Sequence, residues 1–185
     1  MLYTAGVLDR AWYLDKLVQN WINEISSPGL DIFFRAVTQL GSLAAFILLG
    51  VIVFLALWLG GQIRAGMILN GGLIAAWAVM IFLKDLVGRE RPAGEQLTTA
   101  AGMSFPSGHA MLSLVFYGFI AYLLLIRSPS IYGKLVGYTL VVMIGLIGLS
   151  RIYLNVHYAT DVAAGFILGS VILTIMIKVF SRNNS

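Results

Sequence analysis

The chain has no cysteine, only two histidines and few charged side chains among its 185 residues. The lack of cysteine excludes disulfides, iron–sulfur clusters and thiolate zinc sites, and two histidines are too few for a histidine-rich metal site. Charged residues make up 11% of the chain, whereas a soluble domain has roughly 25%. This shortage excludes an ordinary water-soluble globule and a disordered chain. With 59% hydrophobic residues and a mean hydropathy of +0.91, the composition indicates a membrane-embedded protein.

Five long uncharged runs follow one another along the chain. A helix that crosses the hydrocarbon core of a bilayer needs roughly 17–25 apolar residues. One such run can also be a buried core helix, but five in succession favour an all-α integral membrane helical bundle with five transmembrane helices. The runs cover residues 36–63 (most apolar at 42–59), 65–83, 110–126, 135–150 and 162–177. The last two are short, and snorkelling lysines at their ends can extend them.

The segment before these runs has a different pattern. Apolar residues recur at helical spacing, at Leu14, Leu17, Val18, Trp21, Ile22 and Ile25, and polar residues that include Asp15 fill the other face. Ser27 and Pro28 suit the cap and the first position of a following helix, which carries a second apolar stripe. We therefore predict two amphipathic interfacial helices over 1–41, before a transmembrane bundle over 42–180 and a polar tail over 181–185. Ordinary packing of these helices against the bundle is also compatible with the pattern.

Two polar connections lie on the same side of the membrane. The stretch 84–109 joins the second and third spans, and 151–156 joins the fourth and fifth. Because successive spans alternate in direction, one face of the membrane receives three cations, both histidines and a carboxylate: Lys84, Arg91, Arg151, His109, His157 and Asp161. Several fixed cations with many donors suit a phosphate group. Anchoring to lipid headgroups is the alternative, and we favour it for Arg89, since nothing in the sequence pairs Arg89 with the others.

Pro106-Ser107-Gly108-His109 stands at the start of the third span. Proline and serine favour the start of a helix, and free backbone N–H groups in a first turn can bind an anion. Gly108 lets the backbone approach such an anion closely, the Ser107 hydroxyl adds a donor, and His109 is placed to donate a proton. By itself, a Pro-Ser-Gly tripeptide is a common turn.

His157 and Asp161 are spaced i, i+4 and so share one face of a helix. A carboxylate one turn from an imidazole can hold the tautomer of the ring and leave the other ring nitrogen free to attack. The same pair can be purely structural. It can also ligate a metal, but two histidines and one aspartate beside three cations are too few ligands. We therefore expect no metal and no cofactor.

Together, these residues form three motifs: Lys84, six residues, Arg91-Pro92; Pro106-Ser107-Gly108-His109; and Ser150-Arg151, five residues, His157, three residues, Asp161. In order and spacing this set resembles the type 2 phosphatidic acid phosphatase family, whose superfamily includes vanadium haloperoxidases and glucose-6-phosphatase. The resemblance covers about residues 40–180. Membrane members of the family typically have six spans, whereas this chain shows five.

The resemblance implies a role for each motif residue. It makes His157 the nucleophile that forms a phosphohistidine, Asp161 the group that orients it, and His109 the acid that protonates the leaving oxygen and then activates water. It assigns the phosphoryl oxygens to Lys84, Arg91, Ser107, Gly108 and Arg151. The implied reaction is metal-independent, because fixed cations stabilise the charge.

The resulting prediction is an integral membrane lipid phosphatase that binds the bilayer and a phosphate-bearing lipid, and no nucleic acid. We rank undecaprenyl pyrophosphate first as substrate, with phosphatidylglycerophosphate close behind and phosphatidic acid as a further candidate. The loop 96–105 and the N-terminal helices are the expected places where the lipid is selected. A transporter that binds the anion without hydrolysis and an oxidoreductase of the haloperoxidase branch are the alternatives from other classes.

The distribution of Lys and Arg does not orient the bundle. Without the three motif cations, the two faces carry nearly equal numbers of them. The family resemblance implies a site on the extracytoplasmic face of the cell membrane.

Overall fold

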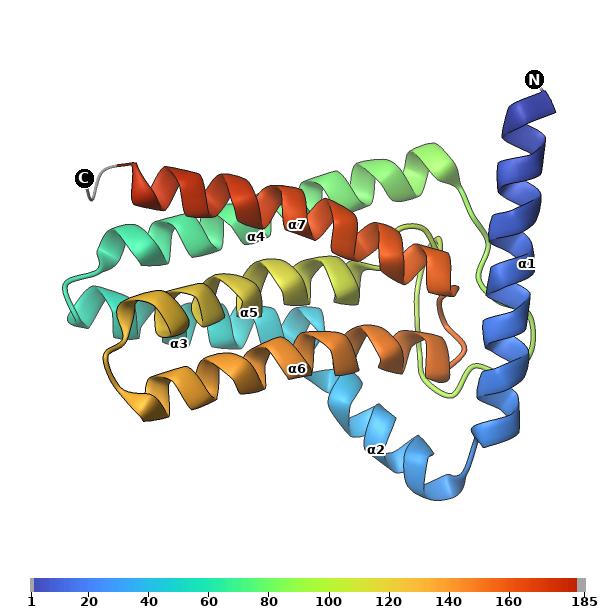
Figure 1. Ribbon diagram of the computed structural model, residues 1–185, viewed down its shortest axis with the longest axis horizontal. Coiled ribbons are helices and arrows are strands. Elements are labelled where there is room, and N and C mark those ends of the chain that lie inside the picture. The colour runs from blue at the N-terminus through green and yellow to red at the C-terminus, as the bar shows by residue number, and fades with distance from the viewer. Residues whose placement is uncertain (1, 183–185) are drawn as a thin grey trace.

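The computed structural model describes residues 2–182, with side chains from residue 12 onward. Every regular element in that part of the chain is a helix, and this confirms the all-α class (Figure 1). The helices are α1 (Leu2–Ile25), α2 (Pro28–Gln39), α3 (Leu43–Leu59), α4 (Ile63–Val87), α5 (Gly108–Arg127), α6 (Ile131–Tyr153) and α7 (Ala159–Ser181). The expected polar tail lies mainly outside the described residues.

Four helices, α4 to α7, are long and apolar enough to cross a membrane. The 17-residue α3 supplies the fifth span when it is counted together with α2, from which it is bent by 48°. The uncharged run 36–63 therefore holds the end of α2 and all of α3. Ser42 begins the second of them, because its side chain accepts a hydrogen bond from the Ala45 N–H at 3.2 Å. The helices α6 and α7 are longer than their uncharged runs because Lys134, Arg151, Asp161 and Lys178 lie within them.

The central helix of the bundle is α5. Half of its most apolar window is buried, against 22–33% for the other long helices, and it packs against α4, α6 and α7. It approaches α7 closely where Gly165 and Gly169 face it one turn apart. A Cβ at Gly165 would lie 2.6 Å from the Ser107 carbonyl oxygen, and one at Gly169 would lie 3.0 Å from that of Met111. Small residues thus bring the start of α7 against the start of α5.

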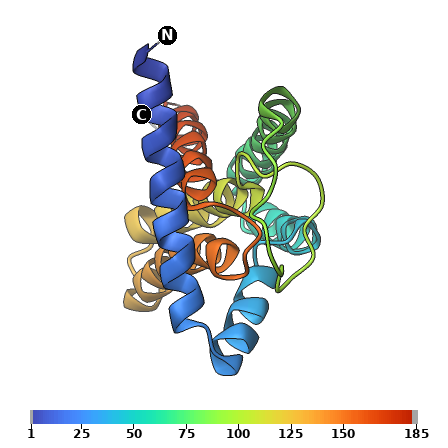
Figure 2. The ribbon, with the colours of Figure 1, turned by 90° about the vertical axis from the view of Figure 1, so that its right-hand side faces the viewer.

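The N-terminal helix α1 lies across one end of the bundle, roughly perpendicular to the long helices (Figures 1 and 2). Its predicted apolar stripe divides in two. Ile22 is buried against a small cluster that includes Phe34 and Tyr153, whereas Leu14, Leu17 and Trp21 are exposed. An exposed apolar stripe on a helix across the end of a bundle fits a helix lying in the membrane interface.

One residue of α1 differs from its predicted environment. Asp15 was expected on the polar face of an interfacial helix, but its relative exposure is 1%. The polar side of α1 faces the bundle at this point because Asp15 has partners there. The expected start of α2 is confirmed, with Pro28 in its first turn and Ser27 at the cap position, although the Ser27 side chain makes no capping hydrogen bond.

Candidate active site

The predicted site residues gather at the end of the bundle that α1 crosses (Figure 1). Lys84 lies in the last turn of α4, Arg151 in that of α6, and Asp161 in the first turn of α7. His109 is the second residue of α5. The long connection between α4 and α5 supplies Arg91 and folds back over the ends of the helices, so that residues of all three motifs meet.

His157 precedes α7 and is 2% exposed. Its Nδ1 lies 3.6 Å from Asp161 Oδ2 and 3.4 Å from Ser104 Oγ. Arg91 Nη1 donates to His157 Nε2 at 3.3 Å. Because a guanidinium can only donate, this contact assigns the lone pair to Nε2 and the proton to Nδ1, on the side of Asp161. The i, i+4 spacing therefore produces the tautomer in which Nε2 can act as a nucleophile.

The carboxylate of Asp161 is fully buried and has hydrogen-bond donors on both oxygens. Ser104 Oγ donates to Oδ2 at 2.5 Å, and the Tyr158 N–H donates to the same oxygen at 3.0 Å. Arg89 Nη1 donates to Oδ1 at 2.6 Å. These donors hold the charged form in place beside the His157 ring.

The side chains of Arg91 and Lys84 bind backbone carbonyls of the α4–α5 connection, and Arg91 also binds one of the α6–α7 connection. Arg91 donates to Ala101 O at 2.7 Å, Gly102 O at 3.0 Å and Val156 O at 2.6 Å. Lys84 Nζ donates to Met103 O at 2.5 Å. Both cations therefore lie beside His157 with neutral carbonyls as partners, which an anion can replace.

Ser107 and Arg151 carry polar atoms that lack partners. Ser107 is fully buried and Arg151 is 3% exposed. Arg151 Nη1 donates to Thr38 Oγ1 at 2.5 Å, but Arg151 Nε and Ser107 Oγ have no hydrogen-bond partner in the described part of the chain. Among the described residues, only one other buried side-chain atom, Gln19 Oε1, also lacks a hydrogen-bond partner. Buried polar atoms are usually satisfied, so these two sites are available to a polar ligand.

The helix α5 begins at the second motif, where the sequence predicts an anion-binding turn. Ser107 is at the cap position, and its side chain makes no capping bond, so the first N–H groups of α5 are not occupied by it. Gly108 packs on Met80, whose sulfur would lie 2.3 Å from an added Cβ. The His109 ring packs beside Gly41, where a Cβ would approach its Cδ2 to 2.8 Å. The bend between α2 and α3 therefore passes directly beside His109.

The electrostatics of the site favour an anion and a neutral His157 ring. Burial lowers the pKa of His157 to about 4; the Asp161 hydrogen bond raises it, and the positive charges of Arg91, Arg151 and Lys84 lower it further. Burial also lowers the pKa of Arg91. Within residues 2–182, no group of three or more His, Cys, Asp or Glu side chains is arranged to hold a metal ion. The charged groups that surround the histidines are mainly cations.

The expectation for Arg89 was wrong. Rather than anchoring the protein to lipid headgroups, Arg89 bridges two carboxylates, Asp15 and Asp161. Sequence reasoning also missed Ser104 and Thr38 as site residues. Ser104 lies within the loop 96–105 and has a weak local signal, since it stands two residues before the second motif. Thr38 and Asp15 have none, because their partners are more than 70 residues away in the sequence.

Together, the helical membrane bundle and a buried His–Asp pair among phosphate-suited cations define the class of protein, a membrane phosphatase. The chain belongs to the PAP2 superfamily, whose sequence profile matches residues 65–185. This membership confirms the family identified from the three motifs.

Individual relatives are similar over most of the chain. Phosphatidylglycerophosphatase B of Bacillus subtilis is 32% identical over 166 residues, which are 89% of this chain and 77% of the relative. Decaprenylphosphoryl-5-phosphoribose phosphatase of Mycobacterium tuberculosis is 32% identical over 114 residues, or 59% of this chain and 58% of the relative.

Two crystal structures have the same fold. One is a transmembrane PAP2 type phosphatidylglycerolphosphate phosphatase from Bacillus subtilis, with a TM-score of 0.88 and 28% identity over 100% of this chain and 93% of the other. The second is LpxE from Aquifex aeolicus, with a TM-score of 0.71 and 25% identity over 86% and 92%. With these relatives, the chain is a multi-pass membrane protein and a lipid phosphatase.

Proposed function

We propose that this protein hydrolyses the phosphate monoester of phosphatidylglycerophosphate through a phosphohistidine on His157. The relative that matches 89% of this chain is a phosphatidylglycerophosphatase. It supports placing this lipid ahead of undecaprenyl pyrophosphate, which reverses the order predicted from the motifs. The polyprenyl-linked substrate in the name of the mycobacterial relative keeps undecaprenyl pyrophosphate as the second candidate.

The observation that carries the proposal is the pair of unpartnered donors, Ser107 Oγ and Arg151 Nε. They belong to two different motifs and are both buried at the end of the bundle where His157 lies. An unsatisfied buried polar group costs about 1–3 kcal/mol. A phosphoryl group has several acceptor oxygens and would satisfy both donors at once.

The first step of the proposed reaction is attack of His157 Nε2 on phosphorus. The N–P bond forms as the bond between phosphorus and the lipid oxygen breaks, and His109 gives that oxygen its proton. Asp161 stabilises the positive charge that develops on the His157 ring, and the proton on Nδ1 stays between them. The products of this step are the lipid alcohol and phosphohistidine.

The second step releases inorganic phosphate. His109, now neutral, takes a proton from a water molecule whose oxygen attacks phosphorus, and the N–P bond breaks. His157 returns to its neutral form and His109 to its protonated form, so the enzyme is restored. In both steps Lys84, Arg91, Arg151, Ser107 and the Gly108 N–H stabilise the equatorial oxygens. Three fixed cations supply the charge that a metal ion supplies in other phosphoryl transfers, so the proposed reaction needs no metal.

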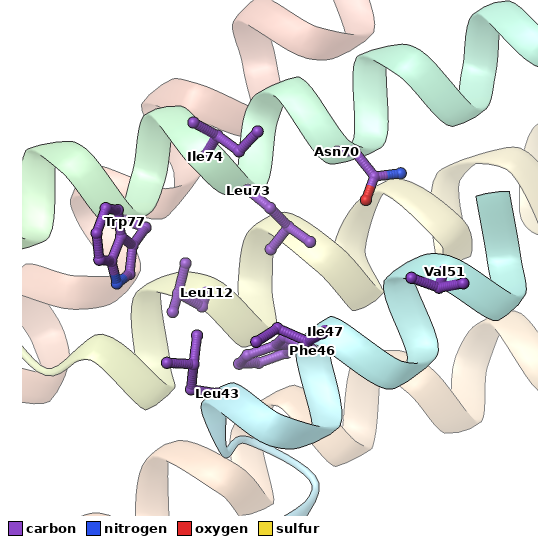
Figure 3. Close-up of a pocket in the computed structure, with 9 residues that line it drawn as sticks. All are labelled: Leu43, Phe46, Ile47, Val51, Asn70, Leu73, Ile74, Trp77 and Leu112. Atoms are coloured by element: carbon purple, nitrogen blue, oxygen red, sulfur yellow. The ribbon is translucent and has the colours of Figure 1, made fainter.

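An apolar groove beside the site suits the substrate's hydrocarbon chain. It lies between α3, α4 and α5 with a volume of about 400 Å³, and Asn70 is its one polar lining residue (Figure 3). Leu43 is the first residue of α3 and Leu112 lies one turn beyond His109, so the groove begins near the reacting end of the bundle. A lipid tail in this groove would remain in the hydrocarbon region while its headgroup reaches the cations.

The experiment is phosphate release by the purified protein in detergent with EDTA present. Phosphatidylglycerophosphate and undecaprenyl pyrophosphate are supplied in parallel, with His157→Ala as the control. We expect release by the wild type alone, and faster release from phosphatidylglycerophosphate. Equal release by His157→Ala would overturn the nucleophile. Folded wild-type protein that binds either lipid without releasing phosphate would support the transporter alternative.

We propose that the site lies on the extracytoplasmic face of the cell membrane. Labelling of a cysteine introduced at the exposed Glu95 with a membrane-impermeant reagent would test this location.

A further inference from the structure

The described part of α1 buries one carboxylate, Asp15, at the end of the bundle that holds the site. Its Oδ1 accepts a hydrogen bond from the Thr160 N–H at 2.9 Å. Its Oδ2 accepts from Thr160 Oγ1 at 2.6 Å and from Arg89 Nη2 at 2.7 Å. Thr160 is the second residue of α7 and directly precedes Asp161. Asp15 therefore contacts the backbone of α7 on one side and Arg89 on the other.

The guanidinium of Arg89 spans the gap between two carboxylates. Nη2 faces Asp15, and Nη1 donates to Asp161 Oδ1 at 2.6 Å and to Thr160 Oγ1 at 2.7 Å. The Tyr158 ring lies against the guanidinium, 4.0 Å from its centre. Burial acts to lower the pKa of Arg89, but hydrogen bonds and charges from Asp15 and Asp161 raise it overall. Arg89 is thus held on three sides, and its charge is shared by both carboxylates.

We propose that Asp15 is a positioning residue for the phosphatase reaction, acting through Arg89 to fix the carboxylate of Asp161 beside His157. The inference rests on the proposed function, in which His157 attacks and Asp161 stabilises it. Neither Asp15 nor Arg89 belongs to the three motifs.

The geometry explains why two carboxylates are needed for one arginine. The Oδ2 oxygen of Asp161 already faces His157, Ser104 and the Tyr158 N–H, so Arg89 controls the other oxygen and hence the rotation of the carboxylate. An arginine bound at one end only would keep several side-chain rotamers. Bound to Asp15 as well, its planar guanidinium has a single orientation. Without Asp15, Asp161 alone would balance the positive charge of Arg89. Asp161 would then stabilise a positive charge on the His157 ring less strongly.

A purely structural role for Asp15 is the competing explanation, because Oδ1 also binds a free N–H in the first turn of α7. Asp15→Asn separates the two roles. An asparagine can retain the oxygen that accepts from the Thr160 N–H, but it places an amide group, a donor, against the Arg89 guanidinium. The variant therefore removes the charge and the contact with Arg89 while it keeps the contact with the α7 backbone.

The test compares kcat and KM of four full-length variants in detergent with wild type: Asp15→Asn, Arg89→Gln, the double variant and Asp31→Asn. Asp31 is the matched control. It is also an aspartate of the N-terminal helices that binds the bundle, through Tyr153 Oη at 2.7 Å, but it does not contact Arg89. We expect kcat to fall roughly 10-fold or more in each of the first two variants, as for other groups that orient a reacting residue. Because neither residue is assigned to the phosphate, we expect KM to change less than about threefold.

If Asp15 acts through Arg89, the double variant should be no slower than the slower single variant. Arg89→Lys should recover part of the lost kcat, since it keeps the charge but cannot bridge both carboxylates. A wild-type kcat in Asp15→Asn, or losses that multiply in the double variant, would overturn the proposal. So would a fall in kcat that only accompanies a lower melting temperature, because that result assigns Asp15 to the attachment of α1.

The outcomes also distinguish this proposal from the proposed function. If wild type is active, His157→Ala is inactive and Asp15→Asn equals wild type, only the positioning role fails. If wild type releases no phosphate, or His157→Ala still turns over, the proposed chemistry fails and the positioning role fails with it.

Discussion

The backbone N–H of Ser107 donates a hydrogen bond to the carbonyl oxygen of Asp161 at 3.0 Å. This bond joins the turn that begins α5 to the first turn of α7. Two residues 54 positions apart in the sequence are therefore joined by a hydrogen bond between backbone groups, which does not depend on their side chains. The relative placement of the proposed acid, His109, and the proposed nucleophile, His157, depends on how closely these two helix starts approach.

Gly165→Ala should separate them. The added Cβ would lie 2.6 Å from the Ser107 carbonyl oxygen, a backbone atom that cannot rotate away. The start of α7 must shift, and a misplacement of about 1 Å can reduce turnover roughly 100-fold. We expect a loss of kcat of that order, with a loss of about 1–3 kcal/mol in stability from overpacking. Phosphate release and thermal unfolding measure the two effects.

The control is Gly145→Ala on α6, where an added Cβ meets no atom within 4 Å. It makes the same chemical change in a transmembrane helix without a steric conflict. Wild-type activity in both variants would show that the contact between α5 and α7 does not set the geometry of the site.

The protonation of His157 should have its midpoint near pH 4, where burial places its pKa, rather than near 6.5. A lowered pKa means that the ring is neutral, and so nucleophilic, at every pH above the midpoint. The acid limb of the rate should therefore lie near pH 4.

Because the chain has only two histidines, the pKa of His157 can be measured directly. In the His109→Gln variant, His157 is the sole histidine and its ring carbon signals in an NMR titration have a single assignment. A midpoint between pH 6 and 7 would contradict the burial of a neutral ring among cations.

Ser107→Ala should lower activity without lowering stability. The hydroxyl is buried and has no partner among the residues that the structure describes, so its removal costs no hydrogen bond there. If the hydroxyl binds a phosphoryl oxygen, its loss removes a hydrogen bond to a charged group, which is worth about 1.5–3 kcal/mol. We expect kcat/KM to fall by about 10-fold to 100-fold, with an unchanged or higher melting temperature. Ser113→Ala is the comparison, since Ser113 is equally buried on the same helix but donates to Ala110 O at 3.1 Å.

Asn155 should be needed both for its backbone conformation and for its side chain. Its φ is +56°, in the left-handed region, and its side-chain amide donates to Ala93 O and Glu95 O and accepts from Gln19. Asn155→Gly keeps the conformation and loses the contacts. Asn155→Ala also loses the conformation, at a further cost of about 1 kcal/mol. Thermal unfolding should rank wild type above Asn155→Gly and that variant above Asn155→Ala. Equal stability of the two variants would remove the backbone argument.

Much of the architecture was predictable because the signals are local. A run of apolar residues predicts its own helix, and the motif residues at the ends of spans meet because alternating spans bring those ends to one side. The break between α2 and α3 lies inside an uncharged run, and Ser42, a good N-cap residue, marks where α3 begins. The contacts of Asp15 with Arg89, and of Thr38 with Arg151, join residues 74 and 113 positions apart. Such pairings depend on how whole helices pack, and no local pattern reports them.

All of the proposed reacting groups extend from one end of the bundle, and none of them lies at the other (Figure 1). A lipid headgroup in the far leaflet is a full hydrocarbon thickness, about 30 Å, away from His157. The protein therefore samples only one leaflet of its membrane. When that leaflet runs short of substrate, the rate of phosphate release is set by how fast lipids cross the bilayer, however fast the chemistry at His157 is.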